Sequence, residues 1–298
     1  MAYFIFVFSG IIIYIALANL LHLQFGLTGI VNFGVVGFWG LGMYGTTVLI
    51  VQYELPFLVA VLLAAGVTTA LAYLLGWLVL DLDSQAVIVA TLAFSTIVSY
   101  LAITEKWLTK GVIGIGTVSF PFDAGRRTDL VYMAILVLLT AGMMWYASKL
   151  KDAPYGRLLQ AIQDNEPLAR GLGKSTSQEK LIFFTVTSGM MGLLGALHAP
   201  VNQFLTPTLL APGVTFTVWI ALILGGKRHV MGGLIGVLVT VGLFDLLIET
   251  YLPLPTNFTI LVPNIKLMLY GLMLMLILMF RPLGILGGRS LRGMLNYV

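Results

Sequence analysis

Few side chains in this sequence could do chemistry, and they lie far apart. Asp245 and Glu249 stand four residues apart in a late apolar stretch, a spacing that puts two carboxylates on one helix face. Acidic side chains inside a membrane are costly, so this pair is a candidate for handling solute or ions. A water-facing helix end close to Pro253 is the alternative. His22 and His198 are isolated histidines, which we interpret as structural residues.

No grouping of residues predicts catalysis, a metal site or a cofactor. The chain has no cysteine, which excludes thiol catalysis and cysteine-ligated metals. The run Gly173-Lys174-Ser175 ends like a phosphate-binding loop, but such a loop needs a glycine at position 168, where this chain has leucine. We therefore expect no catalytic residues, no metal and no cofactor, and we do not expect an enzyme.

The composition is that of a membrane protein. Of the 298 residues, 59% are hydrophobic and 9% are charged, whereas soluble domains carry about 25% charged residues. Apolar runs near the ~20 residues that a spanning helix needs recur along the chain. We predict an all-α polytopic membrane protein with eight or nine spans in a single transmembrane domain, 1–298. The net charge of +4 is too small and too dispersed to indicate nucleic-acid binding.

Polar and Gly/Pro-rich stretches separate the expected spans. The predicted spans are 3–23, 26–51, 56–80, 86–104, 130–148, 181–199, 231–251 and 265–280. A further apolar stretch, 214–224, is short for a full crossing, so we expect it to be tilted or re-entrant.

Stretch 26–51 is unusually rich in glycine. On a continuous helix five glycines would share one side: Gly26, Gly29, Gly34, Gly37 and Gly40. Such a face lets a neighbouring backbone approach closely. The alternative is a broken segment that lines a cavity, where non-helical backbone is tolerated. The candidate residues of a translocation pathway are Asn32, Gly34, Thr91, Ser95, Asp245 and Glu249.

One long polar stretch interrupts the apolar pattern at 153–173, APYGRLLQAIQDNEPLARGLG, and we call it the polar segment. Pro154 suits a helix start, and Gly171 or Gly173 suits its end. Pro167 predicts a bend between two helical pieces. The residues expected on one apolar face are Leu158, Ala161, Ile162, Leu168, Ala169 and Leu172. The opposite face carries charges of both signs, which favours docking onto a protein over anchoring at a membrane surface.

The basic residues predict that the polar segment is cytoplasmic, because Lys and Arg are enriched in cytoplasmic loops. With a cytoplasmic loop at about 149–180, and with 214–224 crossing, eleven of the sixteen basic residues lie inside: Lys149, Lys151, Arg157, Arg170, Lys174, Lys180, Lys227, Arg228, Arg281, Arg289 and Arg292. The exceptions are Lys106, Lys110, Arg126, Arg127 and Lys266.

The run GRLLQAIQDNEPLARGLGKSTSQEKLIFFTVTSGMMGLLGAL is similar to the cytoplasmic region and following span of the branched-chain amino acid ABC transporter permeases, in their LivM-like branch. Further stretches resemble that family in the same order: 26–45, 80–97 with the glycine-rich 111–116, ILGG at 223–226 and RPLG at 281–284. The sequence departs from the family at Asp81 and Asp83, where arginines are frequent, and at Pro167, where alanine is usual.

This resemblance implies a permease subunit of an ATP-driven importer in a bacterial plasma membrane. The implied solutes are branched-chain, hydrophobic or neutral amino acids, with urea and short amides in sister branches. Implied partners are a second homologous permease, two ATP-binding subunits, a periplasmic or extracellular solute-binding protein and membrane lipid. The ATPase would grip the helix within the polar segment. The residues carried over to this coupling role are Tyr155, Gly156, Arg157, Ala161, Ile162, Asp164, Asn165 and Glu166.

Two other functions compete with this interpretation. An ion-coupled secondary transporter also uses glycine-broken helices near mid-membrane. Proton coupling usually requires acids well inside the membrane, but residues 1–80 contain only Glu54, and the docking helix would have no role. An intramembrane enzyme would need a group of catalytic residues, which the sequence does not show. We therefore favour the importer subunit.

Overall fold

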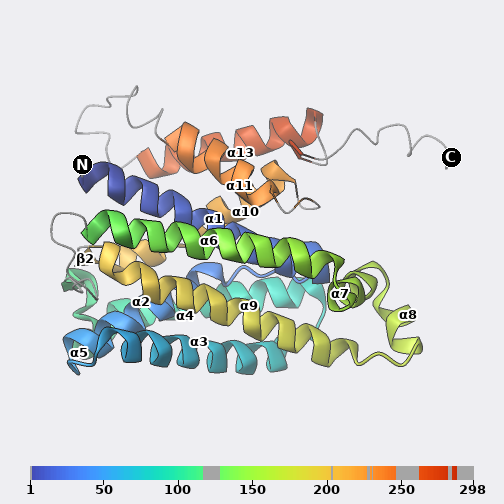
Figure 1. The fold of residues 1–298 in the computed structure, drawn as a ribbon, viewed down its shortest axis with the longest axis horizontal. Coiled ribbons are helices and arrows are strands. Elements are labelled where there is room, and N and C mark those ends of the chain that lie inside the picture. The colour runs from blue at the N-terminus through green and yellow to red at the C-terminus, as the bar shows by residue number, and fades with distance from the viewer. Residues whose placement is uncertain are drawn as a thin grey trace.

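The structure is a computed structural model that describes residues 2–116, 128–202, 204–226, 229, 231–245, 262–280 and 284–286. These residues form a helical bundle (Figure 1). The longer helices are α1 (Ala2–Thr28), α2 (Val35–Val51), α3 (Phe57–Val79), α4 (Ser84–Thr104), α6 (Thr128–Asp152), α9 (Thr176–His198), α10 (Pro212–Gly225) and α13 (Val262–Phe280). The shorter ones are α5 (Lys106–Thr109), α7 (Pro154–Asp164), α8 (Glu166–Gly171) and α11 (Gly232–Val237), which continues into the π-helical η5 (Leu238–Asp245).

A few short elements lie between these helices. They are η1 (Gly111–Ile113), η3 (Ala199–Val201), η4 (Pro207–Leu210) and the strands β1 (Ile115–Gly116) and β2 (Phe204–Leu205). The two strands pair antiparallel, with Ile115 opposite Leu205. They lie with α5 at one end of the bundle, whereas α7 and α8 lie at the other end (Figure 1).

Five of the described helices are long and apolar enough to cross a membrane: α1, α3, α4, α6 and α9. Their lengths confirm an all-α, multi-pass membrane protein. Helices α2 and α10 are only about 26 Å and 21 Å long at 1.5 Å per residue, less than the ~30 Å hydrocarbon core. The count of eight or nine spans is therefore not confirmed. The predicted span 231–251 ends at residues that lie outside the described ones.

Helices α1 and α9 form the centre of the bundle. In their most apolar windows 78% and 61% of the residues are buried, against 22–28% in α3, α4 and α6. The outer helices instead expose large apolar side chains, among them Leu62, Trp77, Ile97 and Leu138. Apolar surface of this extent indicates contact with lipid or with other membrane-embedded protein.

Glycines allow α2 and α9 to touch backbone to backbone. A methyl group on Gly42 would overlap the carbonyl oxygen of Gly192, and one on Gly195 would overlap that of Trp39. On another side of α9, Gly189 and Gly192 meet threonine side chains of α3. The small residues of α9 therefore let it pack closely between α2 and α3, as expected for helices without a hydrophobic driving force between them.

Helices α10 and α11 form an antiparallel pair. Gly225 lies against Gly232, and the carbonyl of Ala221 lies against Gly236, so the two helices run in opposite directions with glycines between them. Gly226, with φ of 111°, follows the last residue of α10 in a conformation that favours glycine. The prediction that 214–224 is tilted or re-entrant stays a prediction, but the chain turns after the roughly 21 Å of α10, and α11 runs back beside it.

The predicted glycine face in 26–51 is wrong in its first part, because the helix is interrupted, whereas close packing is confirmed at Gly37 and Gly40, which lie against Ser95 and Leu210. Helix α1 ends at Thr28, residues 29–34 are non-helical and α2 begins at Val35. Gly29 has a φ of 73°, which a right-handed helix does not allow. Gly26 and Gly29 therefore do not share a helix with the later glycines. The alternative of a broken segment is the geometry that the structure has, and we call residues 29–34 the helix break.

We predict that Gly195→Ala destabilises the protein, because the added methyl group meets the backbone of α2. Overpacking of this kind costs about 1–3 kcal/mol. The measurement is the apparent melting temperature of the detergent-solubilised protein. Gly66→Ala is the matched control, since Gly66 is also helical but has no atom within 4 Å of the added methyl group. The control should match or exceed wild type, because alanine favours helix. An equal loss in both variants would contradict the packing interpretation.

Candidate functional site

The helix break lies inside the bundle, so its backbone groups must find partners within the protein. Asn32, which is 0% exposed, takes part in several of the bonds there. Its Oδ1 accepts from the amide of Gly34 at 2.7 Å, and its Nδ2 donates to Oε1 of Gln24 at 2.9 Å. The Nε1 of Trp219 donates to the Asn32 carbonyl at 3.0 Å. One side chain therefore bridges the end of α1 and the start of α2.

Other helices complete this network. The remaining bonds run from Phe33 N to Thr91 Oγ1 (3.0 Å), from Val36 N to Thr215 Oγ1 (3.2 Å), and from Gln24 Nε2 to Thr187 Oγ1 (2.7 Å) and Ser188 Oγ (3.0 Å). The helix break thus draws on α1, α4, α9 and α10. Because these donors and acceptors are buried, removing one would leave another unpaired, at a cost of about 1–3 kcal/mol.

Aromatic rings cover one side of the helix break. Phe33 stacks on Trp219 with ring centroids 5.1 Å apart and an interplanar angle of 14°. Phe25, in the last turns of α1, meets the same indole edge-on at 5.1 Å, and Phe216 meets Phe33 edge-on at 5.7 Å. Trp219 therefore connects the end of α1, the helix break and α10.

Four of the predicted pathway residues lie at or next to the helix break. Asn32 and Gly34 belong to it, Thr91 bonds to it, and Ser95 lies against Gly37 one turn further along α2. Asn32, Thr91 and Ser95 are all buried within this chain. Asp245 is the last residue of η5, and Glu249 lies outside the described residues. Their role in a solute pathway stays a prediction.

Sequence reasoning missed five members of the network: Gln24, Thr187, Ser188, Thr215 and Trp219. A signal existed for one of them. Gln24 is a large polar side chain within the apolar α1, and polar groups in a span usually mark a partner or a function. The threonine and serine of α9 carry no such signal, because small hydroxyl residues are common in membrane helices and bond to their own backbone.

The polar segment forms two helices. Helix α7 begins at Pro154 in its first turn and ends at Asp164, and Asn165 then adopts an extended conformation with φ of −157°. The Asn165 side chain accepts from the amide of Leu168 at 3.0 Å and so caps α8. Pro167 lies in the first turn of α8, where its missing N–H is tolerated. The predicted two pieces are confirmed, with the break at Asn165, two residues before the proline.

The predicted apolar face of the polar segment is wrong in part. The buried residues are Gly156, Leu159, Ile162 and Ala169, whereas Ala161, Leu168 and Leu172 are exposed. The prediction assumed one helical register across Pro167, and the extended Asn165 interrupts that register. Leu168 and Leu172 are 61% and 74% exposed, so two large apolar side chains face away from the protein.

Helix α7 is attached to the end of α1. The Nε2 of Gln163 donates to the carbonyl of Phe25 at 3.0 Å, and its Cγ lies 3.3 Å from the position of a Cβ on Gly29. Tyr155 meets Phe183 of α9 edge-on. Burial, and then the charge of Glu179, raise the pKa of Tyr155 to about 12, so this hydroxyl stays neutral at physiological pH.

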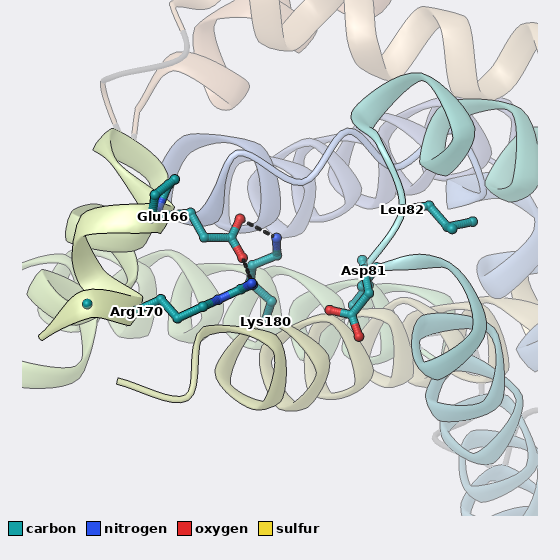
Figure 2. Close-up of a pocket in the computed structure, with 8 residues that line it drawn as sticks. Asp81, Leu82, Glu166, Arg170 and Lys180 are labelled. Carbon is teal, nitrogen blue, oxygen red and sulfur yellow. Dashed lines mark hydrogen bonds and ion pairs between the residues drawn. The ribbon is translucent and has the colours of Figure 1, made fainter. Parts of the chain in front are cut away.

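Helix α8 is attached to α9 by charge. Glu166 bonds to Lys180 at 2.8 Å and to Arg170 at 3.2 Å, and Figure 2 shows the carboxylate between the two bases. Burial alone would raise the pKa of Glu166, but the hydrogen bond and charge of Lys180, with Arg170, outweigh it and lower this pKa. Glu166 is therefore ionised at neutral pH. Arg170 also donates to Thr176 Oγ1 at 3.3 Å.

The predicted coupling residues differ in exposure. Arg157, Ala161, Asp164 and Asn165 are exposed, Tyr155 and Glu166 are half-buried, and Gly156 and Ile162 are buried. Gly156 lies so close to the Leu150 carbonyl that a methyl group would overlap it. Some of these residues thus hold α7 on the bundle, and the others face solvent. Among the described residues no group of His, Asp and Glu could hold a metal ion.

The comparison with known protein families decides the class of this chain. Residues 1–278 match the family described as branched-chain amino acid transport system / permease component. The chain belongs to this family.

Individual relatives agree with the family match. The permease is 27% identical over 300 residues to the high-affinity branched-chain amino acid transport system permease protein LivM of Salmonella typhimurium, a match that covers 92% of this chain and 68% of the relative. LivM of Escherichia coli is 26% identical with the same coverage. A probable branched-chain amino acid transport permease protein LivH of Methanocaldococcus jannaschii is 25% identical over 263 residues, covering 83% of this chain and 79% of the relative.

We predict that Asn165→Ala loosens α8 without unfolding the permease. Loss of a helix N-cap costs about 1 kcal/mol, so the amides of 166–171 should exchange hydrogen about fivefold faster. The measurement is hydrogen–deuterium exchange followed by mass spectrometry. Asn165→Asp, which can still cap, should keep wild-type exchange, and so should Asp164→Ala at the neighbouring exposed position. Unchanged exchange in Asn165→Ala would show that this cap does not hold α8.

Proposed function

We propose that the permease is a transmembrane subunit of an ATP-driven importer. The polar segment would receive force from a separate ATP-binding subunit, and the spans would form the translocation pathway with a second homologous permease. A solute-binding protein outside the cell would deliver the solute. The proposed location is a bacterial plasma membrane, with 149–180 in the cytoplasm and the whole of 1–298 acting as one transmembrane domain.

One observation carries this proposal beyond the family match. Leu168 of α8 and Leu172, which directly follows α8, are exposed. They belong to the polar segment, which lies at one end of the bundle (Figure 1). Exposed apolar side chains next to charges of both signs are the composition of a protein-docking surface. Arg157 and Asp164 on α7, and Asn165 after it, extend that surface. We therefore assign the contact with the ATPase to α8 and to the exposed side of α7.

The attachments of the polar segment provide a mechanical route into the bundle. Gln163 joins α7 to the end of α1, directly before the helix break. Phe25 lies on the same helix end and packs on Trp219, whose indole donates to the helix break. A displacement of α7 would thus reach α1, the helix break and α10 through adjacent contacts.

The described spans do not favour ion coupling. Within α1, α3, α4, α6 and α9, acidic residues occur only in end turns, at Asp129, Asp152 and Glu179. A proton relay would require acids well inside these helices. The proposed solutes are branched-chain or other neutral amino acids, in line with the printed descriptions of the relatives. The absence of charge inside the described spans suits a solute of no net charge.

We predict that Leu168→Ser weakens the docking of the ATPase. Burying a leucine side chain contributes about 1.5–3 kcal/mol, so the permease should retain at least tenfold less ATP-binding subunit. The measurement is co-purification with the tagged permease, together with ATPase activity stimulated by the solute-binding protein. The substitution removes an exposed side chain, so membrane insertion should be unchanged.

Val112→Ser is the matched control for this test. Val112 is 73% exposed and belongs to η1, at the opposite end of the bundle from α8. It should leave co-purification of the ATP-binding subunit at the wild-type value. If Leu168→Ser and Leu172→Ser both retain full ATPase binding and stimulation, the ATPase does not dock on α8.

We predict a different result for Gln163→Leu, which keeps the size of the side chain but removes the bond to Phe25. The ATPase should still bind, because Gln163 is attached to α1 rather than to α8. Solute-stimulated uptake into proteoliposomes should fall severalfold, since α7 would no longer move with the end of α1. Gln178→Leu, at an exposed position on α9, is the control. Normal uptake in Gln163→Leu would exclude this route of transmission.

A further inference from the structure

Two adjoining cavities open where α8 faces the turn between α3 and α4. The larger has a volume of about 570 Å³. The smaller, of about 180 Å³, extends to the backbone of residues 28–31 at the helix break. Both share the wall formed by Leu80, Leu82, Glu166 and Lys180. We call the larger cavity the charged crevice.

The charged crevice has acidic and basic side chains on two opposing walls. Glu166, Arg170 and Lys180 stand on one wall, where the carboxylate of Glu166 is shared by the two bases. Asp81 stands on the other wall, and its carboxylate lies across the crevice from that cluster (Figure 2). Among the described residues Asp81 has no hydrogen-bond or ion-pair partner. With two acids and two bases, the lining has no net charge.

On the wall opposite Asp81, some N–H donors of Arg170 remain free. Arg170 uses its Nη2 and Nε toward Glu166 and Thr176, and a guanidinium offers five N–H donors in total. Its side chain is 63% exposed, so the remaining donors can reach an anionic group. Leu80 and Pro167 add apolar surface between the charged groups.

We propose that the charged crevice binds a small zwitterion, with its ammonium group on Asp81 and its anionic group on Arg170. An anion without a cationic group would meet the carboxylates of Asp81 and Glu166, and a cation without an anionic group would meet Arg170 and Lys180. A ligand with both charges avoids each conflict. This chemistry has two sources: a free neutral amino acid, or the headgroup of phosphatidylethanolamine in the adjacent leaflet.

The expected consequence rests on the proposed function. A zwitterion in the crevice connects the turn between α3 and α4 to α8, so it holds the polar segment against the bundle. The contact between α8 and α9 consists of the Glu166–Lys180 ion pair and the bonds from Arg170 to Thr176 Oγ1, and α8 buries little apolar surface besides Ala169. A bound ligand therefore adds a constraint on the segment that the ATPase must move. With an amino acid as ligand, accumulated product on the cytoplasmic side slows its own import.

The first test measures binding of L-leucine to the permease complex without solute-binding protein, in nanodiscs that contain no phosphatidylethanolamine. Asp81→Asn should lower the affinity at least tenfold, because a charge-assisted hydrogen bond is lost. Asp83→Asn is the matched control: it removes the same charge from the same turn, but Asp83 does not line either cavity. L-leucinamide and 4-methylpentanoate, which each lack one charge, should not compete.

The second test uses native mass spectrometry on the same complex in mixed phosphatidylethanolamine and phosphatidylcholine. If the wild type and Asp83→Asn retain phosphatidylethanolamine and Asp81→Asn does not, the ligand is the lipid headgroup. If leucine binding is weakened by Asp81→Asn and unchanged by Asp83→Asn, the ligand is the free amino acid. If neither ligand depends on Asp81, the proposal is overturned.

These outcomes are separate from those of the ATPase experiment. Both binding measurements are made at equilibrium and need no ATP hydrolysis. If Leu168→Ser loses ATPase docking but no ligand binding depends on Asp81, the zwitterion site is disproved and the proposed function is kept. Binding that depends on Asp81, with normal docking in the Leu168 and Leu172 variants, would keep the site and remove its role in ATPase coupling.

Discussion

Inside an apolar bundle every backbone amide and carbonyl needs a partner, and in this permease the helix break concentrates that requirement in six residues. The Asn32 side chain meets part of this requirement, because it accepts from the Gly34 amide and donates to the Gln24 side chain. Thr91 and Trp219 bring α4 and α10 to the same place. Because each partner belongs to a different helix, the position of one non-helical segment fixes the relative positions of four helices. Helix α10, too short to span a bilayer alone, is held in the same way.

The polar segment depends on the same region. The last carbonyls of a helix have no partner within it, and the Phe25 carbonyl at the end of α1 accepts from Gln163 of α7 as well as from the Gly29 amide. The segment that faces the outside of the bundle thus completes the hydrogen bonding of the helix that ends at the break. This shared carbonyl is the reason that a surface helix and a buried break, separated by more than 120 residues, form one structural unit.

The sequence predicted the long spans well, because apolar runs bounded by polar turns leave few alternatives. Helices α3, α4, α6 and α9 begin and end within about five residues of their predicted limits. The glycine-rich stretch was harder to predict, because glycine is used both for close helix packing and for a break in a helix. The positive φ of Gly29 shows that the helix breaks there, and the sequence does not encode that angle. The bonds from Gln24 to Thr187 and Ser188 join residues more than 160 positions apart, and no local pattern encodes such pairs. The exposure of Leu168 could not be predicted from the helical periodicity or the composition of the polar segment, because it depends on where Asn165 interrupts the helix.

The two halves of the polar segment are attached with different strength. Helix α7 buries Leu159 and Ile162 and packs its Gly156 against the end of α6, contacts that separation would expose to water. Helix α8 buries only Ala169 among its residues and is tied to α9 by the half-buried Glu166–Lys180 ion pair and by the bond from Arg170 to Thr176. Separating α8 from the bundle would expose less apolar surface than separating α7, so we expect α8 to shift more easily than α7. The extended residue Asn165 connects α7 to α8. Under the proposed function, a force on α8 would first separate it from α9 and would reach α1 through α7, so a ligand near Glu166 would act on the first contact to open.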